Sequence, residues 1–220
     1  MQGRIVLRFV SVLTLVGAIL FAADGSMHYW QGWTLLAVMF VANAAIFAYL
    51  AKHDPELLQR RLDRREKRRV QRWFQAVGMG SWVGALALSA VDHRFGWSGK
   101  VPWWVSVGSE IVMVMGYAVA FEVLRANPYA GATIGVAAEQ KVITTGPYAW
   151  VRHPMYAGIG LSVLAVPPAL GSWFGLILAW GMVAMLVIRM LDEEKLLRAE
   201  LPGYADYCAR VKWRLAPGVY

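Results

Sequence analysis

The stretch that decides the fold is GPYAWVRHPMY at residues 146–156, which leads directly into an apolar run ending near residue 169. Pro154 has no N–H to donate and restricts the residue before it to an extended conformation, so we expect a helix to begin at Pro154. The first turn of a helix has unpaired N–H groups, and with Arg152 beside them they favour an anionic group. Polar and aromatic residues at the mouth of an apolar helix predict a functional site.

The composition around this stretch is that of a membrane protein. Of the 220 residues, 58% are hydrophobic and 16% are charged, and the mean hydropathy is +0.45. A soluble domain of this length is less apolar and more charged. We therefore predict an all-α integral membrane protein with about five to six transmembrane helices. The expected segments are residues 5–23, 30–50, 74–91, 101–124, 154–169 and 172–191.

The last two segments form a tight pair, joined by a turn that contains Pro167, Pro168 and Gly171. Because residues 154–169 are few for a perpendicular crossing, this C-terminal hairpin either spans the bilayer or is re-entrant. We expect the first segment, 5–23, to be a membrane span and not a cleaved signal, because its apolar stretch is too long.

The distribution of basic residues predicts the topology. Of the 22 Lys and Arg residues, 20 lie in segments assigned to one side of the membrane and 2 on the other. The positive-inside rule then places both termini and the long loops in the cytoplasm. Short loops and the lack of added domains look bacterial, so we expect the inner membrane. The charge of +8 is accounted for in this way, and we expect no nucleic-acid partner.

We divide the chain into N-terminal transmembrane helices at 1–124 and a C-terminal region at 125–220. The basic segment at 52–73 reads as one cytoplasmic amphipathic helix with Pro55 near its start. Its arginines either pair with anionic lipid headgroups or belong to a solvated connector that fixes topology. With one cysteine, Cys208, the chain has no intrachain disulfide or cysteine-based zinc site, and we expect no metal.

Two clusters of residues could carry chemistry, and both face the cytoplasm in this topology. One lies at 127–156, and the other, at 189–194, contains Arg189, Glu193 and Glu194. The open end of the hairpin would bring Arg152 and His153 near Arg189 and Glu193, as a site requires. The alternative is a charge patch at the end of a helix, because Arg189 and Glu193 are four residues apart and could pair with each other.

The motif residues follow one another over the C-terminal part of the chain. They are Gly146, Pro147, Tyr148, Arg152, His153, Pro154, Met155, Tyr156, Gly158, Glu193, Glu194, Leu197, Tyr204 and Tyr207. In this combination, residues 125–217 resemble the isoprenylcysteine carboxyl methyltransferase family, whose wider group includes membrane phospholipid N-methyltransferases. The resemblance implies a pocket for S-adenosylmethionine at the cytoplasmic face.

The resemblance also implies individual roles. Arg189 falls where the eukaryotic enzymes place an arginine that contacts the substrate, so Arg189 and Glu193 are the candidate catalytic residues. The candidate cofactor-binding residues are Gln140, Lys141, Val142, Ile143, Tyr148, Arg152, His153, Pro154, Met155, Tyr156, Glu193 and Glu194.

The chemistry of the cofactor suits these residue types. Either Glu193 or Glu194 could receive its ammonium group, and either Arg152 or the helix start at Pro154 its carboxylate. The aromatic rings of Tyr148 and Tyr156 could stack on adenine or face the sulfonium.

The acceptor decides which other groups are needed. A carboxylate acceptor is already ionised and requires only a cation to orient it, for which Arg189 would serve. An amine or thiol acceptor must lose a proton, and His153 or Glu194 would then be the candidate base. We favour a carboxylate on an amphiphilic, membrane-borne substrate. A phospholipid or another lipid amine or thiol is the alternative.

Two other functions compete with methyl transfer. A sterol-type membrane reductase would use NADPH instead, and it would carry extra basic residues for the 2′-phosphate and usually more spans. A non-enzymatic membrane scaffold would use its charge patches for topology alone, so a change at Glu193 would leave it unaffected.

Overall fold

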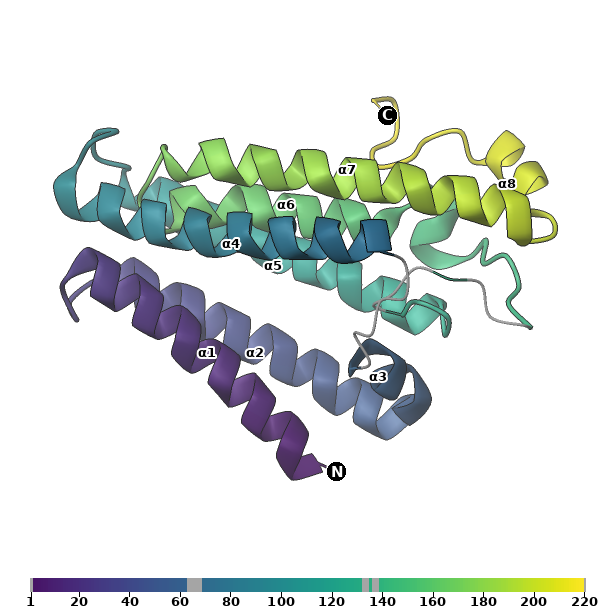
Figure 1. Ribbon diagram of the computed structural model, residues 1–220, viewed down its shortest axis with the longest axis horizontal. Helices are drawn as coiled ribbons and strands as arrows, with labels where there is room; N and C mark the ends of the chain where they lie inside the picture. Colours follow the sequence, from purple (N-terminus) through teal and green to yellow (C-terminus); the bar gives the residue numbers. More distant parts are fainter. Residues whose placement is uncertain (1, 63–68, 132–134, 136–138, 220) are drawn as a thin grey trace. The chain divides into compact units, whose positions relative to one another are not determined.

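The computed structural model describes residues 2–62, 69–131, 135 and 139–219 (Figure 1). Every regular element in these ranges is helical, as predicted. The helices are α1 (Gln2–Asp24), α2 (Trp30–His53), α3 (Pro55–Leu62), α4 (Arg69–Phe95), α5 (Trp103–Ala126), the 3₁₀ helix η1 (Gly146–Ala149), α6 (Pro154–Ala169), α7 (Gly175–Glu200) and α8 (Tyr204–Arg210).

Six apolar helices correspond to the six predicted segments. Four of them are long and apolar enough to cross a membrane, at Trp30–His53, Trp73–Phe95, Trp103–Ala126 and Gly175–Glu200. The other two, at Phe9–Asp24 and Pro154–Ala169, are apolar but shorter. This is the architecture of an all-helical integral membrane protein.

The segment at 52–73 differs from the prediction of one amphipathic helix. Helix α2 ends at His53, and α3 begins anew at Pro55 and covers only eight residues; residues 63–68 lie outside those that the structure describes. The break has a local cause, because Pro55 disfavours helical geometry at Asp54. The Asp54 carboxylate then caps α3 by accepting the Leu57 N–H at 2.8 Å.

Helix α7 is longer than its apolar run. The predicted segment stops at residue 191, whereas the helix continues to Glu200. Residues 192–200 are mostly strong helix formers, and Glu194 and Arg198 pair one turn apart. The acidic residues near the end of the span therefore lie inside a continuous helix, which fixes the direction of their side chains.

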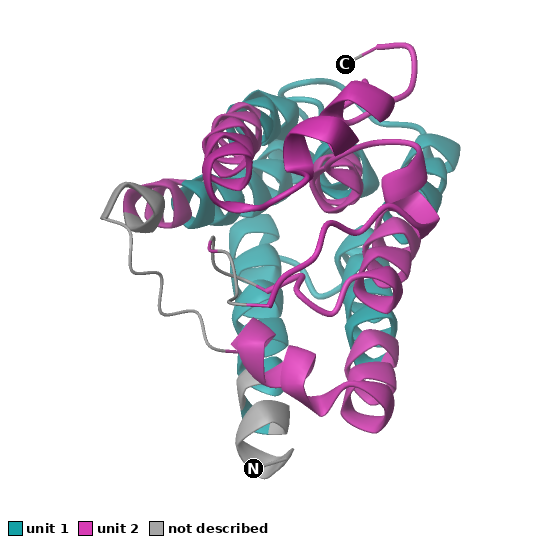
Figure 2. Ribbon diagram, turned by 90° about the vertical axis from the view of Figure 1, so that its right-hand side faces the viewer, with its two compact units in different colours: residues 1–44, 78–114, 162–183 teal, residues 45–77, 115–161, 184–220 magenta. Residues whose placement is uncertain are grey.

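The chain forms two compact units (Figure 2). The first comprises residues 1–44, 78–114 and 162–183, and the second comprises residues 45–77, 115–161 and 184–220. Each unit combines pieces from the N-terminal and C-terminal parts of the sequence. The functional division between residues 1–124 and 125–220 stays a prediction.

Buried polar groups hold the first unit together. Asp92, which is 1% exposed, accepts hydrogen bonds from the Ser98 N–H at 2.8 Å and from the Ser172 hydroxyl at 2.6 Å. Tyr29 stacks on His93 with ring centroids 4.3 Å apart and donates its hydroxyl to the Leu170 carbonyl. These contacts tie the loop after α4 and the turn between α6 and α7 to one buried carboxylate and one buried ring.

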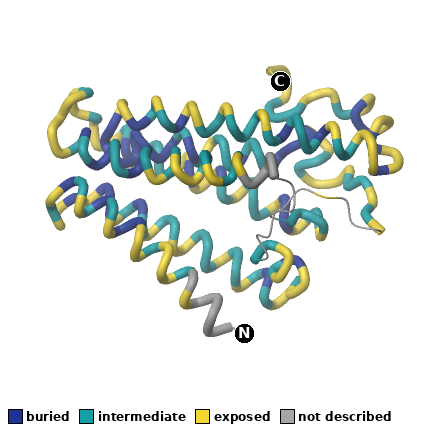
Figure 3. Tube along the Cα trace, in the orientation of Figure 1, coloured by how far each residue is buried: buried dark blue, intermediate teal, exposed yellow. Residues whose placement is uncertain are grey.

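Among its described residues, the second unit has two small apolar cores. Figure 3 shows buried residues in dark blue. One consists of Leu50, Leu57 and Leu124, with Met155 packed against it. The other consists of Leu201, Tyr204, Tyr207 and Cys208, with Val142 packed against it. Both cores include residues close to the predicted site, so packing positions the site from two sides.

Helices α5 and α6 approach closely at Gly158. A Cβ atom at this position would lie 2.7 Å from the Gly116 carbonyl oxygen, a backbone atom that cannot move away cheaply. We expect Gly158→Ala to lower the free energy of unfolding by roughly 1–3 kcal/mol, as overpacking does. Thermal unfolding of the detergent-purified protein measures the effect.

Gly160 provides the matched control on the same helix. Nothing lies within 4 Å of a Cβ atom built there, so Gly160→Ala is expected to stabilise the helix by about 1 kcal/mol. Equal unfolding temperatures for the two variants would contradict the close approach.

Candidate functional site

The predicted site lies in the second unit, where helix α6 begins at Pro154 as expected. The residues before it are held by the C-terminal tail. The backbone N–H of Arg152 donates to the Trp213 carbonyl, and that of His153 donates to the Arg214 carbonyl, both at 2.9 Å. The tail therefore fixes the backbone of the motif and uses two N–H groups that could otherwise have faced a ligand.

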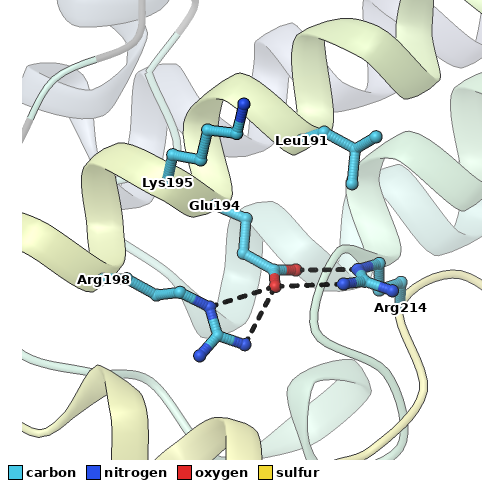
Figure 4. Close-up of a pocket in the computed structure, with 5 residues that line it drawn as sticks. All are labelled: Leu191, Glu194, Lys195, Arg198 and Arg214. Carbon is cyan, nitrogen blue, oxygen red and sulfur yellow. Dashed lines mark hydrogen bonds and ion pairs between the residues drawn. The ribbon is translucent and has the colours of Figure 1, made fainter.

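Glu194 lies at the centre of a buried ionic cluster. Its carboxylate contacts Arg152 at 3.4 Å, His153 at 3.2 Å, Arg198 at 3.1 Å and Arg214 at 3.1 Å. Figure 4 shows the side chains of Arg198 and Arg214 converging on it from α7 and from the tail. A carboxylate with several cationic partners is stabilised in its charged form and holds these segments together.

This arrangement separates the two glutamates that the sequence leaves as alternatives. The charge of Glu194 is already balanced by side chains of the protein, so its geometry is that of an anchor. Glu193 is the glutamate whose surroundings are better suited to an external ammonium group. The roles of both residues stay predictions.

A second cluster forms around Tyr156 on α6. Its hydroxyl donates to the Glu193 carboxylate at 2.6 Å and also hydrogen-bonds the Arg189 guanidinium. Arg189 and Glu193 lie one turn apart on α7, so they share the helix face that Tyr156 contacts. The open end of the hairpin thus brings Tyr156 to Glu193, whereas Arg152 and His153, which were expected near Arg189 and Glu193, contact Glu194.

Tyr148 is positioned through its backbone and its ring oxygen. The Tyr207 hydroxyl donates to the Tyr148 carbonyl at 2.8 Å, and the Asn127 amide donates to the Tyr148 hydroxyl at 2.8 Å. Burial raises the pKa of Tyr148 to about 12 and that of Tyr207 well above its usual range. Both phenols therefore stay protonated at neutral pH and can act as hydrogen-bonding groups, not as bases.

The remaining predicted residues differ in their surroundings. Gln140 and Ile143 are half-buried, and Lys141 is exposed. Val142 and Met155 pack against the two apolar cores, and Pro154 is buried at the helix start. Packing alone accounts for Val142 and Met155, so their part in cofactor binding stays a prediction.

The sequence reasoning missed two residues of the Glu194 cluster. Arg198 had a usable signal, because it follows Glu194 by four residues on a helix. Arg214 had none, because only the path of the tail brings it to a residue 20 positions earlier.

Two comparisons with known proteins bear on this geometry. Residues 104–201 match the phospholipid methyltransferase family. The chain also has the fold of a solved eukaryotic intramembrane Ras methyltransferase, isoprenylcysteine carboxyl methyltransferase. That structure matches with a TM-score of 0.61 and 18% sequence identity, over 96% of this chain and 75% of the other. No curated protein sequence matches this chain.

The family match includes the start of α6 and the acidic residues of α7, and the structural match extends over nearly the whole chain. Residues 104–201 are therefore similar to the phospholipid methyltransferase family, and the resemblance of the chain to isoprenylcysteine carboxyl methyltransferases and their wider group is confirmed.

Proposed function

We propose that the protein is an S-adenosylmethionine-dependent methyltransferase that acts on an amphiphilic acceptor from the bilayer. The observation that carries the proposal is the contact of Tyr156 with both Glu193 and Arg189. It unites an acid, a cation and an aromatic ring at the start of α6. The matched family and the fold of the chain support the same reading.

The residue types fit the proposed cofactor. S-adenosylmethionine has an ammonium, a carboxylate, a sulfonium and an aromatic base. Glu193 would bind the ammonium, and the rings of Tyr156 and Tyr148 would lie against the sulfonium or the adenine. When bound, the cofactor would supply an activated methyl group for direct displacement by the acceptor, with the electron pair of the broken bond left on sulfur.

In this proposal the protein contributes position and electrostatics. Arg189 would bind an acceptor carboxylate through its guanidinium fork and aim one oxygen at the methyl group. No proton has to be removed from a carboxylate at neutral pH, so no base is required. Alignment and exclusion of water then supply the acceleration.

A lipid amine is the second candidate acceptor, because the matched family is named for phospholipids. An amine must be deprotonated before it attacks. His153 is 5% exposed and its Nε2 faces the Glu194 carboxylate at 3.2 Å, so its surroundings are those of an anchored side chain. This contact is the reason to place the carboxylate acceptor first.

Calorimetric titration tests the cofactor. We expect the detergent-purified chain to bind S-adenosylmethionine and Glu193→Gln to bind it at least tenfold more weakly, since a hydrogen bond to a charged group is worth roughly 1.5–3 kcal/mol. Glu200→Gln is the matched control, because Glu200 is an exposed glutamate at the end of the same helix. Its affinity should equal that of the parent protein.

A parallel titration with NADPH distinguishes a methyltransferase from a sterol-type reductase. Binding of NADPH without binding of S-adenosylmethionine would assign the protein to the reductases. A folded sample that binds neither ligand would refute the proposal and favour the scaffold.

A further inference from the structure

A hollow of about 340 Å³ lies beside the Glu194 cluster, within the second unit. It is lined by Leu191, Glu194, Lys195, Arg198 and Arg214 (Figure 4). It is formed by α7 and the C-terminal tail, and its lining includes neither Arg189 nor Glu193. The proposed methyl transfer therefore gives it no role.

The hollow has an excess of positive charge. Its lining contains three cationic side chains and one carboxylate, and that carboxylate also neutralises the buried Arg152 behind it. With three cationic side chains to one carboxylate, the lining of the hollow would attract an anion.

Two buried polar atoms without a hydrogen-bond partner belong to residues that interact with Glu194, although neither residue lines the hollow. Arg152 is 6% exposed, and its Nε has no hydrogen-bond partner; Tyr204 is 4% exposed, and its hydroxyl likewise has none. Both residues interact electrostatically with Glu194, and so they belong to its surroundings. Unpaired buried donors are costly, so the surroundings of Glu194 contain more donors than its carboxylate satisfies.

An apolar stripe leads up to the hollow along one face of α7. Ala184, Ile188, Leu191, Lys195 and Arg198 follow one another at intervals of four, three, four and three residues. At 3.6 residues per turn this spacing keeps them on one side of the helix, opposite Arg189 and Glu193. Ala184 and Ile188 are exposed, Leu191 is half-buried, and Lys195 is exposed. The stripe thus changes from apolar to cationic within four turns.

We propose that this face of α7 binds an anionic phospholipid of the bilayer, with its phosphate in the hollow. The phosphate would contact Arg198 and Arg214, and the exposed Lys195 side chain, which points away from them in Figure 4, would turn to reach it. An acyl chain would lie along Ala184, Ile188 and Leu191. Glu194 orients the two guanidinium groups from behind. The order of the residues matches that of a lipid, because the apolar part of the stripe lies in a membrane span and the cations follow at its charged end.

The site is independent of the proposed methyl transfer. It lies on the opposite side of α7 from the candidate catalytic residues, and it would bind lipid as a support for the fold. A soluble phosphate would use the cations alone and leave the apolar stripe without a function.

Lipid titration of the full-length, detergent-purified chain tests the proposal, with binding followed by the rise in unfolding temperature. The probes are phosphatidylglycerol, phosphatidylcholine and inorganic phosphate. We expect phosphatidylglycerol to stabilise the protein most. Lys195→Glu should weaken this binding about thirtyfold, because each charge near an anionic lipid contributes roughly a fivefold factor.

Lys52→Glu is the matched control, since Lys52 is an exposed lysine at the end of α2 in the same unit. Lys52→Glu changes the net charge of the protein by the same amount as Lys195→Glu but lies outside the proposed site. It should therefore leave the phosphatidylglycerol affinity within about threefold of the parent value. Without lipid, both variants should unfold near the parent temperature, because Lys195 and Lys52 are exposed.

Three results would overturn the proposal. One is equal weakening by Lys195→Glu and Lys52→Glu, which would mean general charge attraction. Another is equal stabilisation by phosphatidylcholine. The third is full stabilisation by inorganic phosphate, which would identify a soluble anion as the ligand.

Discussion

Glu194→Gln is expected to lower the free energy of unfolding by roughly 3–5 kcal/mol, the cost of removing one partner from a buried ion pair. The glutamine keeps the size of the side chain but leaves Arg152 without its counter-charge and changes the group that His153 contacts, and the side chains of both are at most 5% exposed. Arg198 adds less, because its side chain is 45% exposed and water can solvate it. Thermal or denaturant unfolding in detergent measures the loss.

A second substitution distinguishes an ionic cause from a general loss of packing. Arg152→Met in the Glu194→Gln background removes the buried unpaired charge, so we expect it to recover part of the lost stability. If Glu194→Gln unfolds at the same temperature as the exposed control Glu200→Gln, the cluster does not hold the tail to α7.

The second large effect is on turnover. Arg189→Met should lower kcat/KM for a prenylated cysteine carboxylate by roughly 10²–10³, the usual effect of removing one preorganised charge-stabilising group. Methionine keeps the apolar length of the side chain but cannot bind a carboxylate. S-adenosylmethionine should still bind within a few-fold of the parent affinity, as calorimetry would show. This result rests on the proposed function.

Arg189→Lys and a change of acceptor sharpen this test. Lysine retains the charge but lacks the planar fork, so it should restore only part of the activity. With phosphatidylethanolamine as the acceptor, no carboxylate is methylated and the same substitution should matter less. Faster turnover of the amine than of the carboxylate by the parent protein would reverse our order of acceptors.

The sequence alone predicted the helical membrane fold because its signals are local. Apolar runs identify the membrane spans directly. Pro154 marks the start of a helix through the covalent geometry of its ring. The pairing of α6 with α7 followed from the short turn between them. This pairing predicted that Arg152 and His153 would approach Arg189 and Glu193. In the structure both contact the adjacent Glu194, and it is Tyr156 that hydrogen-bonds Glu193.

Two further features were not predicted, the first for a local reason and the second because it depends on contacts between distant segments. Asp54 and Pro55 divide the basic segment, although its composition reads as a single helix. Glu194 and Glu193 are adjacent and chemically alike, yet one is surrounded by cations and the other contacts Tyr156. Adjacent positions on a helix point about 100° apart and therefore face different neighbours. The sequence determined which part of the chain would contain the acids and cations. Only the tertiary structure decided which glutamate became an anchor, because the tail and Arg214 reach it from outside any local pattern.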